Sequence, residues 1–187
     1  MKKILFAASE AVPFMKTGGL ADVTGSLPKY FDKKNYDVRV ILPKYVCMEE
    51  RWKGQLHFLC HFYVNLSWRK QYVGIFETTY DGITYYLVDN EFYFAGNAPY
   101  NNIYEDVEKF AFFSKAVLEA LPYLDFCPDI IHCHDWQTGL LPVFLRTLYG
   151  DEEYYTGIKT VFSIHNLKFQ GRWKLPAVMD ITGLPEQ

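Results

Sequence analysis

Short apolar runs alternate along this chain with segments of helical periodicity, and this alternation restricts the fold more than any other feature. Residues 3–8 form one apolar run, and residues 37–42 form a second that Pro43 closes. Between them, apolar residues recur at helical spacing from residue 20 to residue 31. The first 43 residues therefore predict a β-α-β unit with two parallel strands.

The middle of the chain has a different pattern. Residues 55–66, 71–78 and 83–88 are rich in β-branched and aromatic side chains, as is typical of strands. The last two runs are separated by Tyr80-Asp81-Gly82, a sequence suited to a tight hairpin turn. This segment predicts an antiparallel insertion.

Predicted helices and strands alternate again in the second half of the chain. A long amphipathic helix is expected before Pro122, with one apolar face that includes Val107, Phe110 and Leu118. A strand at 129–133, a helix at 137–149 and a strand at 160–164 follow. We therefore expect an α/β fold over residues 1–187: a single domain with a doubly wound, mostly parallel sheet and an antiparallel hairpin insertion.

The composition of the chain restricts the kinds of partner that it can bind. The formal net charge is −3, so the chain has no basic field to attract nucleic acid or an anionic membrane. No apolar stretch approaches the roughly 18 residues of a membrane span. The four cysteines are irregularly spaced and fit reduced thiols in a cytoplasmic protein better than a disulfide framework.

Three polar clusters directly follow predicted strands, where ligands bind in open α/β sheets. The first contains Lys16, Gly18, Gly19 and Asp22. Paired glycines allow close approach to the backbone, and a helix start with a nearby lysine suits an anion. The spacing is neither a Walker loop nor a dinucleotide fingerprint, so an ordinary strand-to-helix turn remains the alternative.

The second cluster is His132-Cys133-His134-Asp135-Trp136. Asp135 is placed either to cap the following helix or to bind a hydroxyl group. Neighbouring side chains of a strand point to opposite faces, and no second ligand pair follows, so the cluster does not favour a metal site.

The third cluster includes His165, Asn166 and Gly171. His165 and Asn166 offer donors and acceptors suited to sugar hydroxyls, although a structural role for the histidine is equally consistent with the sequence.

Together these clusters carry a family resemblance. The run from Lys16 to Val23, the run from Pro128 to Trp136, and His165-Asn166-Leu167 with Gln170-Gly171 resemble the N-terminal signatures of bacterial glycogen synthases and plant starch synthases. Order and separation match as well, and the resemblance covers nearly the whole chain.

The resemblance implies the N-terminal half of a two-domain, GT-B-type glycosyltransferase with Rossmann-like domains. Such an enzyme transfers glucose from ADP-glucose to the non-reducing end of an α-1,4-glucan, with retention and without a metal or cofactor. The resemblance implies Asp135 and His165 as catalytic residues; the implied substrate-binding residues are Lys16, Gly18, Gly19, Asp22, His134 and Asn166.

Members of this family continue into a second, nucleotide-binding domain, so we expect this chain to be an incomplete part that is inactive alone. Two alternatives remain open. One is a different two-domain transferase that uses a nucleotide sugar, and the other is a non-catalytic carbohydrate-binding module, which would also explain the many aromatic residues.

Overall fold

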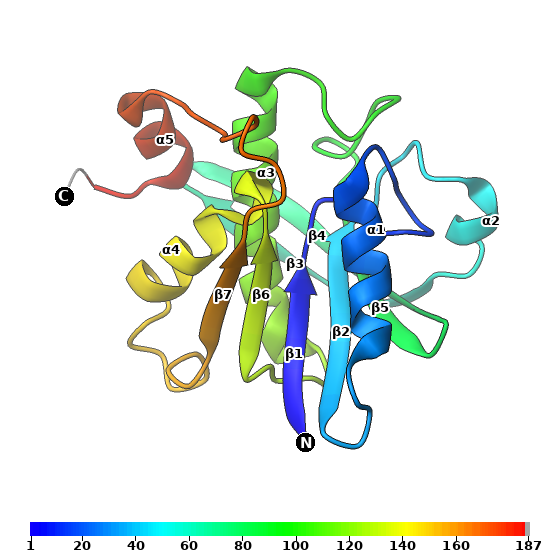
Figure 1. Cartoon of the computed structure of the whole chain (residues 1–187). Helices are drawn as coiled ribbons and strands as arrows, with labels where there is room; N and C mark the ends of the chain where they lie inside the picture. The colour runs from blue at the N-terminus through cyan, green and yellow to red at the C-terminus, as the bar shows by residue number, and fades with distance from the viewer. Residues whose placement is uncertain (186–187) are drawn as a thin grey trace.

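Seven strands form one sheet within residues 1–185, the part of the chain that this computed structural model describes (Figure 1). Their order is β3-β4-β5-β2-β1-β6-β7. Their bounds are β1 Lys2–Ala7, β2 Tyr36–Pro43, β3 His57–Leu66, β4 Arg69–Tyr80, β5 Ile83–Asp89, β6 Ile130–His134 and β7 Lys159–Ser163. All neighbours from β5 to β7 pair parallel, whereas β3, β4 and β5 pair antiparallel. The predicted mostly parallel sheet is confirmed, and the insertion extends this same sheet.

The opening β-α-β unit is also confirmed, because β1 and β2 are parallel neighbours joined through α1 (Gly19–Ser26). The helix is shorter than its sequence pattern predicted. It ends at Ser26 and continues as a 3₁₀ helix, η1 (Leu27–Tyr30), which has Pro28 at its start. Proline cannot donate the hydrogen bond that an α-helix needs there. Tyr30 is one of the residues whose helical spacing between residues 20 and 31 predicted an apolar face, but it is 84% exposed.

The hairpin between β4 and β5 turns at Asp81 and Gly82, with φ of 50° and 71°. Two residues with positive φ are the backbone of a type I′ turn, so the predicted tight hairpin turn is confirmed. The start of β3 was placed too early. A short helix, α2 (Glu50–Lys53), precedes the strand, and the Gln55 amide donates to the Trp52 carbonyl.

The longest helix, α3 (Ile103–Ala120), begins at Asn102, whose side chain accepts hydrogen bonds from the amides of Tyr104 and Glu105. A 3₁₀ turn that contains Pro122, η2 (Leu121–Tyr123), ends it. No helix within residues 1–185 is long and apolar enough to cross a membrane.

The predicted helix at 137–149 is two elements, η3 (Trp136–Thr138) and α4 (Leu140–Thr147). One continuous helix would put Pro142 in its interior, whereas the observed break leaves Pro142 in the first turn of α4. Leu148 lies at helical spacing from Leu141 and Phe144, which predicts that it faces inward, but it is 40% exposed at the end of α4. The last helix, α5 (Leu175–Thr182), contacts α3.

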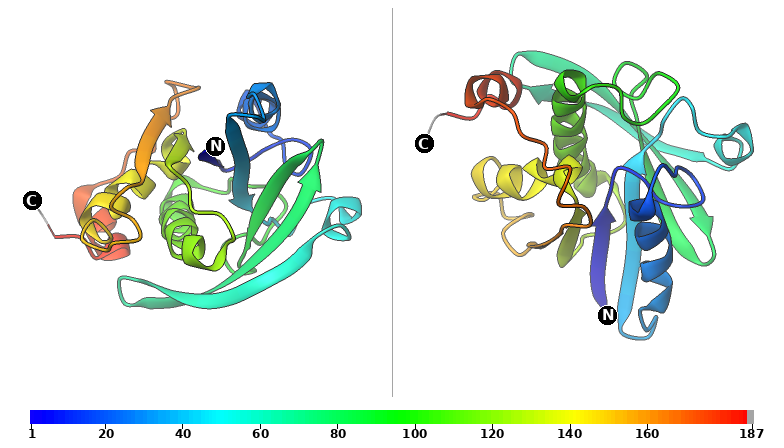
Figure 2. Two further views of the ribbon diagram at one scale, coloured as in Figure 1. Left: turned by 90° about the horizontal axis from the view of Figure 1, so that it is seen from below. Right: turned by 45° about the horizontal axis from the view of Figure 1, so that its top comes forward.

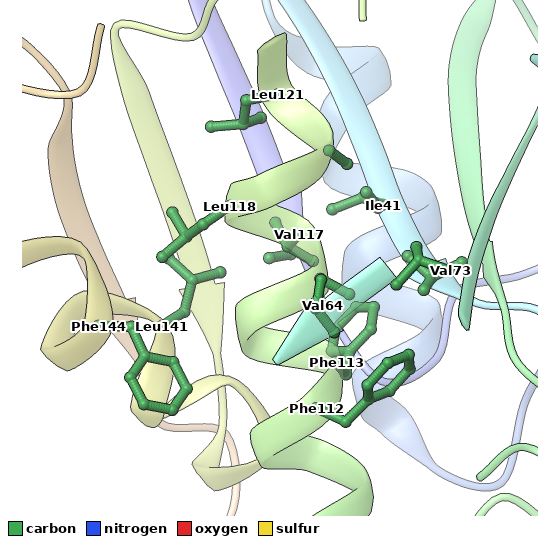
Figure 3. Close-up of a cluster of buried hydrophobic side chains, with 14 of the residues drawn as sticks. Ile41, Val64, Val73, Phe112, Phe113, Val117, Leu118, Leu121, Leu141 and Phe144 are labelled. Atoms are coloured by element: carbon green, nitrogen blue, oxygen red, sulfur yellow. The ribbon is translucent and has the colours of Figure 1, made fainter. Parts of the chain in front are cut away.

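The central strands are buried on both faces. In β1, Ile4 and Phe6 join one apolar cluster, while Leu5 and Ala7 join the other. The larger cluster packs under α3 and α4 (Figure 3), and the smaller lies on the opposite face of the sheet. Figure 2 shows α1 and α3 on opposite sides of the sheet, with β3 and β4 curving around α3. The fold is therefore doubly wound, as predicted.

Gly25 in α1 allows a close contact that the sequence analysis did not anticipate. A Cβ atom on Gly25 would lie 2.4 Å from both Cγ2 and the carbonyl oxygen of Val12. We expect Gly25→Ala to lower the free energy of unfolding by about 1–3 kcal/mol through overpacking, although alanine favours helix. Urea denaturation measures this change.

Gly19→Ala is the matched control, because it lies in the same helix and its Cβ would meet nothing within 4 Å. If Gly25→Ala were as stable as Gly19→Ala, the close contact between α1 and Val12 would not restrict the packing of this helix.

Candidate functional site

A cavity of about 1240 Å³ lies beyond the carboxyl ends of β1, β6 and β7. Its lining comes from the segment after β1, the segment that enters α3, and the segments after β6 and β7. Gly18, Gly19, Asp135, His165 and Asn166 all belong to the lining. The three polar clusters therefore converge on one rim of the sheet, as the common direction of their strands predicted.

Glu10 organises the first cluster, and the sequence analysis did not assign it to the site. Its side chain is buried, and its Oε2 accepts hydrogen bonds from the Thr17 amide at 2.6 Å and the Thr17 hydroxyl at 2.8 Å. Burial raises the pKa of Glu10, while the bonds from Thr17 and Gly18 oppose this rise. The sequence could have indicated Glu10 as a site residue, because it is a carboxylate that closely follows a buried strand.

The two glycines of this cluster face open space. Gly18 has an extended backbone, and a Cβ there would approach nothing closer than Glu10 Oε1 at 3.9 Å. A Cβ on Gly19 would meet no atom within 4 Å. No contact within the described chain therefore requires glycine at either position, and the exposed backbone leaves room for a ligand to approach.

Lys16 and Asp22 lie beside the cavity rather than in its lining. Lys16 Nζ is 2.7 Å from Asp22 Oδ1, and about half of each side chain is exposed. Exposed ion pairs contribute little to stability, so Lys16 can exchange this partner for another anion at small cost.

Asp135 joins the loops that follow β6 and β7. Its Oδ1 accepts a hydrogen bond from the His165 amide at 2.7 Å, and its own amide donates to the Ser163 carbonyl at 2.9 Å. Its side chain makes no capping bond to η3, so the alternative role as a helix cap is wrong. The backbone has φ 59° and ψ 177°, a region almost restricted to glycine.

A row of histidines lies beneath the third cluster. His134 is fully buried, and its Nδ1 is 2.9 Å from Nε2 of His165, with the rings inclined by only 11°. The His132 ring stacks on His134 with centroids 4.1 Å apart. Burial, followed by the charges of His132 and His165, lowers the pKa of His134 to about 3.

His134 therefore does not line the cavity, although the sequence predicted that it contacts substrate. It touches His165, which does line the cavity. Cys133 points to the opposite, apolar face, as the strand alternation predicted. Within residues 1–185, no group of three or more His, Cys, Asp or Glu side chains is arranged to hold a metal ion.

The far wall of the cavity depends on a buried ion pair that the sequence analysis missed. Lys109 Nζ donates to Asp106 Oδ1 and to the Pro99 carbonyl, both at 2.8 Å. Next to this pair, the Tyr100 hydroxyl is 2.7 Å from the Ser9 hydroxyl. The sequence could have indicated this pair, because Asp106 and Lys109 are three positions apart in α3. Such spacing, however, usually indicates an exposed pair.

The segment after β7 closes the cavity beside α3. Gly171 has φ 57°, and a Cβ there would lie 2.6 Å from the Trp136 ring. The Trp173 indole donates to the Ile103 carbonyl at 2.7 Å. This segment adds the cations Lys168 and Arg172 to the lining.

The backbone strain at Asp135 gives a testable comparison. Asp135→Ala and Asp135→Gly both remove the carboxylate, but only glycine relieves the positive φ. We expect the glycine variant to unfold with a free energy about 1–3 kcal/mol higher than the alanine variant. Urea denaturation of the two variants measures the difference.

The same pair of substitutions at Glu105, exposed in α3, is the control, and there alanine should be the more stable. An equal or reversed order at Asp135 would contradict the strain.

The buried His134 predicts a dependence of stability on pH. The unfolded chain protonates this side chain near its ordinary pKa of 6.5, whereas the folded chain resists protonation until about pH 3. The unfolded state therefore binds more protons in this window, and stability falls as the pH falls. Between pH 6.5 and 5, His134 alone should account for a loss of about 1.6 kcal/mol.

The variant His134→Asn lacks this histidine, so it should lose less stability between pH 6.5 and pH 5 than the wild-type protein does. The difference should equal the contribution of His134, and denaturant unfolding at the two pH values measures it. His57→Asn, an exposed change on β3, is the matched control. An unchanged loss in the His134 variant would contradict a buried, neutral histidine.

Comparison with known proteins places this geometry in a family. The family model for the starch synthase catalytic domain matches residues 3–187. Glycogen synthases of Lachnoclostridium phytofermentans and Lachnospira eligens are 66% and 62% identical to the chain. Each match covers 100% of this chain and 39% of the relative, so the chain spans about two fifths of these proteins.

A solved structure agrees with the sequence matches. The catalytic domain of starch synthase IV from Arabidopsis thaliana, bound to ADP and acarbose, superposes with a TM-score of 0.85 at 29% sequence identity. The superposition covers 98% of this chain and 37% of that one. By sequence and by fold, the chain belongs to the starch synthase catalytic domain family.

Proposed function

We propose that this chain forms the acceptor-side part of a glycogen synthase, which transfers glucose from ADP-glucose to the non-reducing end of an α-1,4-glucan with retention. The observation that carries the proposal is the cavity beyond β1, β6 and β7, in a chain 66% identical to a glycogen synthase. The ADP bound to the plant starch synthase supports ADP-glucose as the donor.

The polar lining suits a sugar held between several hydrogen-bonding groups. Asp135 accepts from the His165 amide through Oδ1, which leaves Oδ2 available for a substrate hydroxyl. His165 and Asn166 supply a ring nitrogen and an amide on the same side of the cavity. In this proposal, Asp135 orients the acceptor and His165 contacts the glucosyl group that is transferred.

Departure of the nucleotide develops negative charge on its diphosphate. Cations and free backbone amides that are already in place stabilise such charge as it forms. Lys16 stands beside the first turn of α1, where Gly18 and Gly19 leave the backbone accessible. We assign the donor phosphate region to Lys16 and these two glycines, with Asp22 holding the lysine until the donor binds.

This chain lines only one side of the proposed active site, so a closed site needs a second wall from elsewhere. The cavity opens to solvent along this chain, and closure of two domains normally excludes water and completes such sites. In this proposal, the remaining part of the full-length protein supplies that wall, with most of the contacts to the nucleotide.

The test uses the full-length protein with radiolabelled ADP-glucose and maltoheptaose. We expect glucose to be incorporated into longer α-1,4-glucans, and Lys16→Gln to reduce kcat/KM for the donor by the equivalent of about 2–4 kcal/mol. Lys34→Gln is the matched control, because Lys34 is exposed just before β2, at the opposite end of the sheet.

Residues 1–187 alone should bind maltooligosaccharides weakly and transfer no glucose. Rapid transfer by this part alone would contradict the need for a second wall. Unchanged donor kinetics in Lys16→Gln would remove the phosphate role of Lys16, and binding of glucans by a full-length protein without any transfer would favour a carbohydrate-binding module.

A further inference from the structure

We propose that His134 is a positioning residue that holds His165 as its Nδ1–H tautomer, so that His165 offers a hydrogen-bond donor to the ligand in the cavity. The inference deepens the proposed function, because it states which chemical group one wall presents. It rests on the contact between Nδ1 of His134 and Nε2 of His165, which are 2.9 Å apart.

At this distance one nitrogen donates and the other accepts, so two arrangements are possible. In the first, His134 Nδ1–H donates to His165 Nε2. In the second, His165 Nε2–H donates to His134 Nδ1. A neutral imidazole has a single N–H, so each arrangement determines the state of the other nitrogen in His134.

The second nitrogen of His134 distinguishes the two arrangements. Within residues 1–185, His134 Nε2 is buried and has no hydrogen-bond partner. The second arrangement would place the proton of His134 on this atom and bury an N–H group without an acceptor. The first leaves only an unpaired acceptor there. Orphaned buried N–H groups are rarer than under-satisfied acceptors, so the first arrangement is favoured.

The protonation states of His134 and His165 do not change which of the two arrangements is favoured. Burial depresses the pKa of His134, with further lowering by His132 and His165, so the ring stays neutral. A doubly protonated His165 would have to donate through Nε2, which reverses the bond and again creates the unpaired N–H on His134. Phe6 packs against the rings of both His132 and His134, so their arrangement is held by contacts outside the cavity.

The remaining atoms then define what His165 can recognise. Its amide is bound to Asp135 and its Nε2 is bound to His134. Its Nδ1–H has no acceptor within residues 1–185 and belongs to a side chain of the cavity lining. A ligand group that contacts this atom must accept a hydrogen bond, as a hydroxyl oxygen or a phosphate oxygen does.

The first test is spectroscopic and does not depend on activity. Full-length protein with ¹⁵N-labelled histidine is studied by NMR at neutral pH, and the His165 signals are identified by their loss in His165→Gln. We expect a protonated Nδ1 and an unprotonated Nε2 in His165. A protonated Nε2 in His165 would overturn the proposal.

The second test compares two substitutions at His134. Asn carries an amide near the position of Nδ1 and can still donate, whereas Leu fills the space without a donor. We expect His134→Leu to reduce kcat about 10-fold or more, by analogy with the partners that orient metal-binding histidines, and His134→Asn to retain most of the rate. Circular dichroism verifies that each variant is folded.

Equal loss of kcat in two folded variants would contradict a role through donation. If His134→Leu does not fold, the tautomer in the wild-type protein and its retention in His134→Asn decide the question. Absence of transferase activity in the wild-type protein would refute the proposed function, whereas the NMR result would still support or overturn the tautomer.

Discussion

Burial of the central strands on both faces determines most of this structure. Successive side chains of β1 enter two different apolar clusters, and both clusters must be covered by helices and loops. Parallel strands satisfy this need through crossovers that return along one face or the other. Because β1, β6 and β7 then run in the same direction, the segments that follow them emerge at one rim. The cavity is a consequence of this arrangement.

The rim is kept rigid by buried polar groups, each tied to a different segment. Glu10 holds the loop before α1 through Thr17, and Lys109 holds the segment before α3 through the Pro99 carbonyl. Burying such groups costs free energy unless they are hydrogen-bonded, so each contact removes a cost that any displaced loop would restore. The backbone strain at Asp135 is retained in the same way, because its carboxylate is fixed to the His165 amide.

The sequence predicted the sheet, the parallel opening unit and the convergence of three clusters, because these follow from local periodicity and strand direction. It did not predict Glu10 or the pair of Asp106 and Lys109 as parts of the site. Those contacts join residues only three to ten positions apart, but they depend on the path of a loop and on how deeply a helix face is buried, which periodicity does not report. The break between η3 and α4 was predictable from Pro142, whose position argued against a continuous helix.

The charged groups around the cavity are arranged in a way that the net charge of −3 does not reveal. The acidic groups of the lining are directed into the protein: Glu10 toward Thr17, Asp106 toward Lys109, and one oxygen of Asp135 toward the His165 amide.

The cations are in the opposite situation. Lys168 and Arg172 form no salt bridge within residues 1–185, and Lys16 has only its exposed partner Asp22. Charges that are already paired at short range contribute little field at a distance, whereas unpaired cations in a concave site act on an entering ligand directly. Lys109 offsets the charge of Asp106, so Lys168 and Arg172 are left to meet an anion that enters the cavity, where the Gly18 and Gly19 backbone is open.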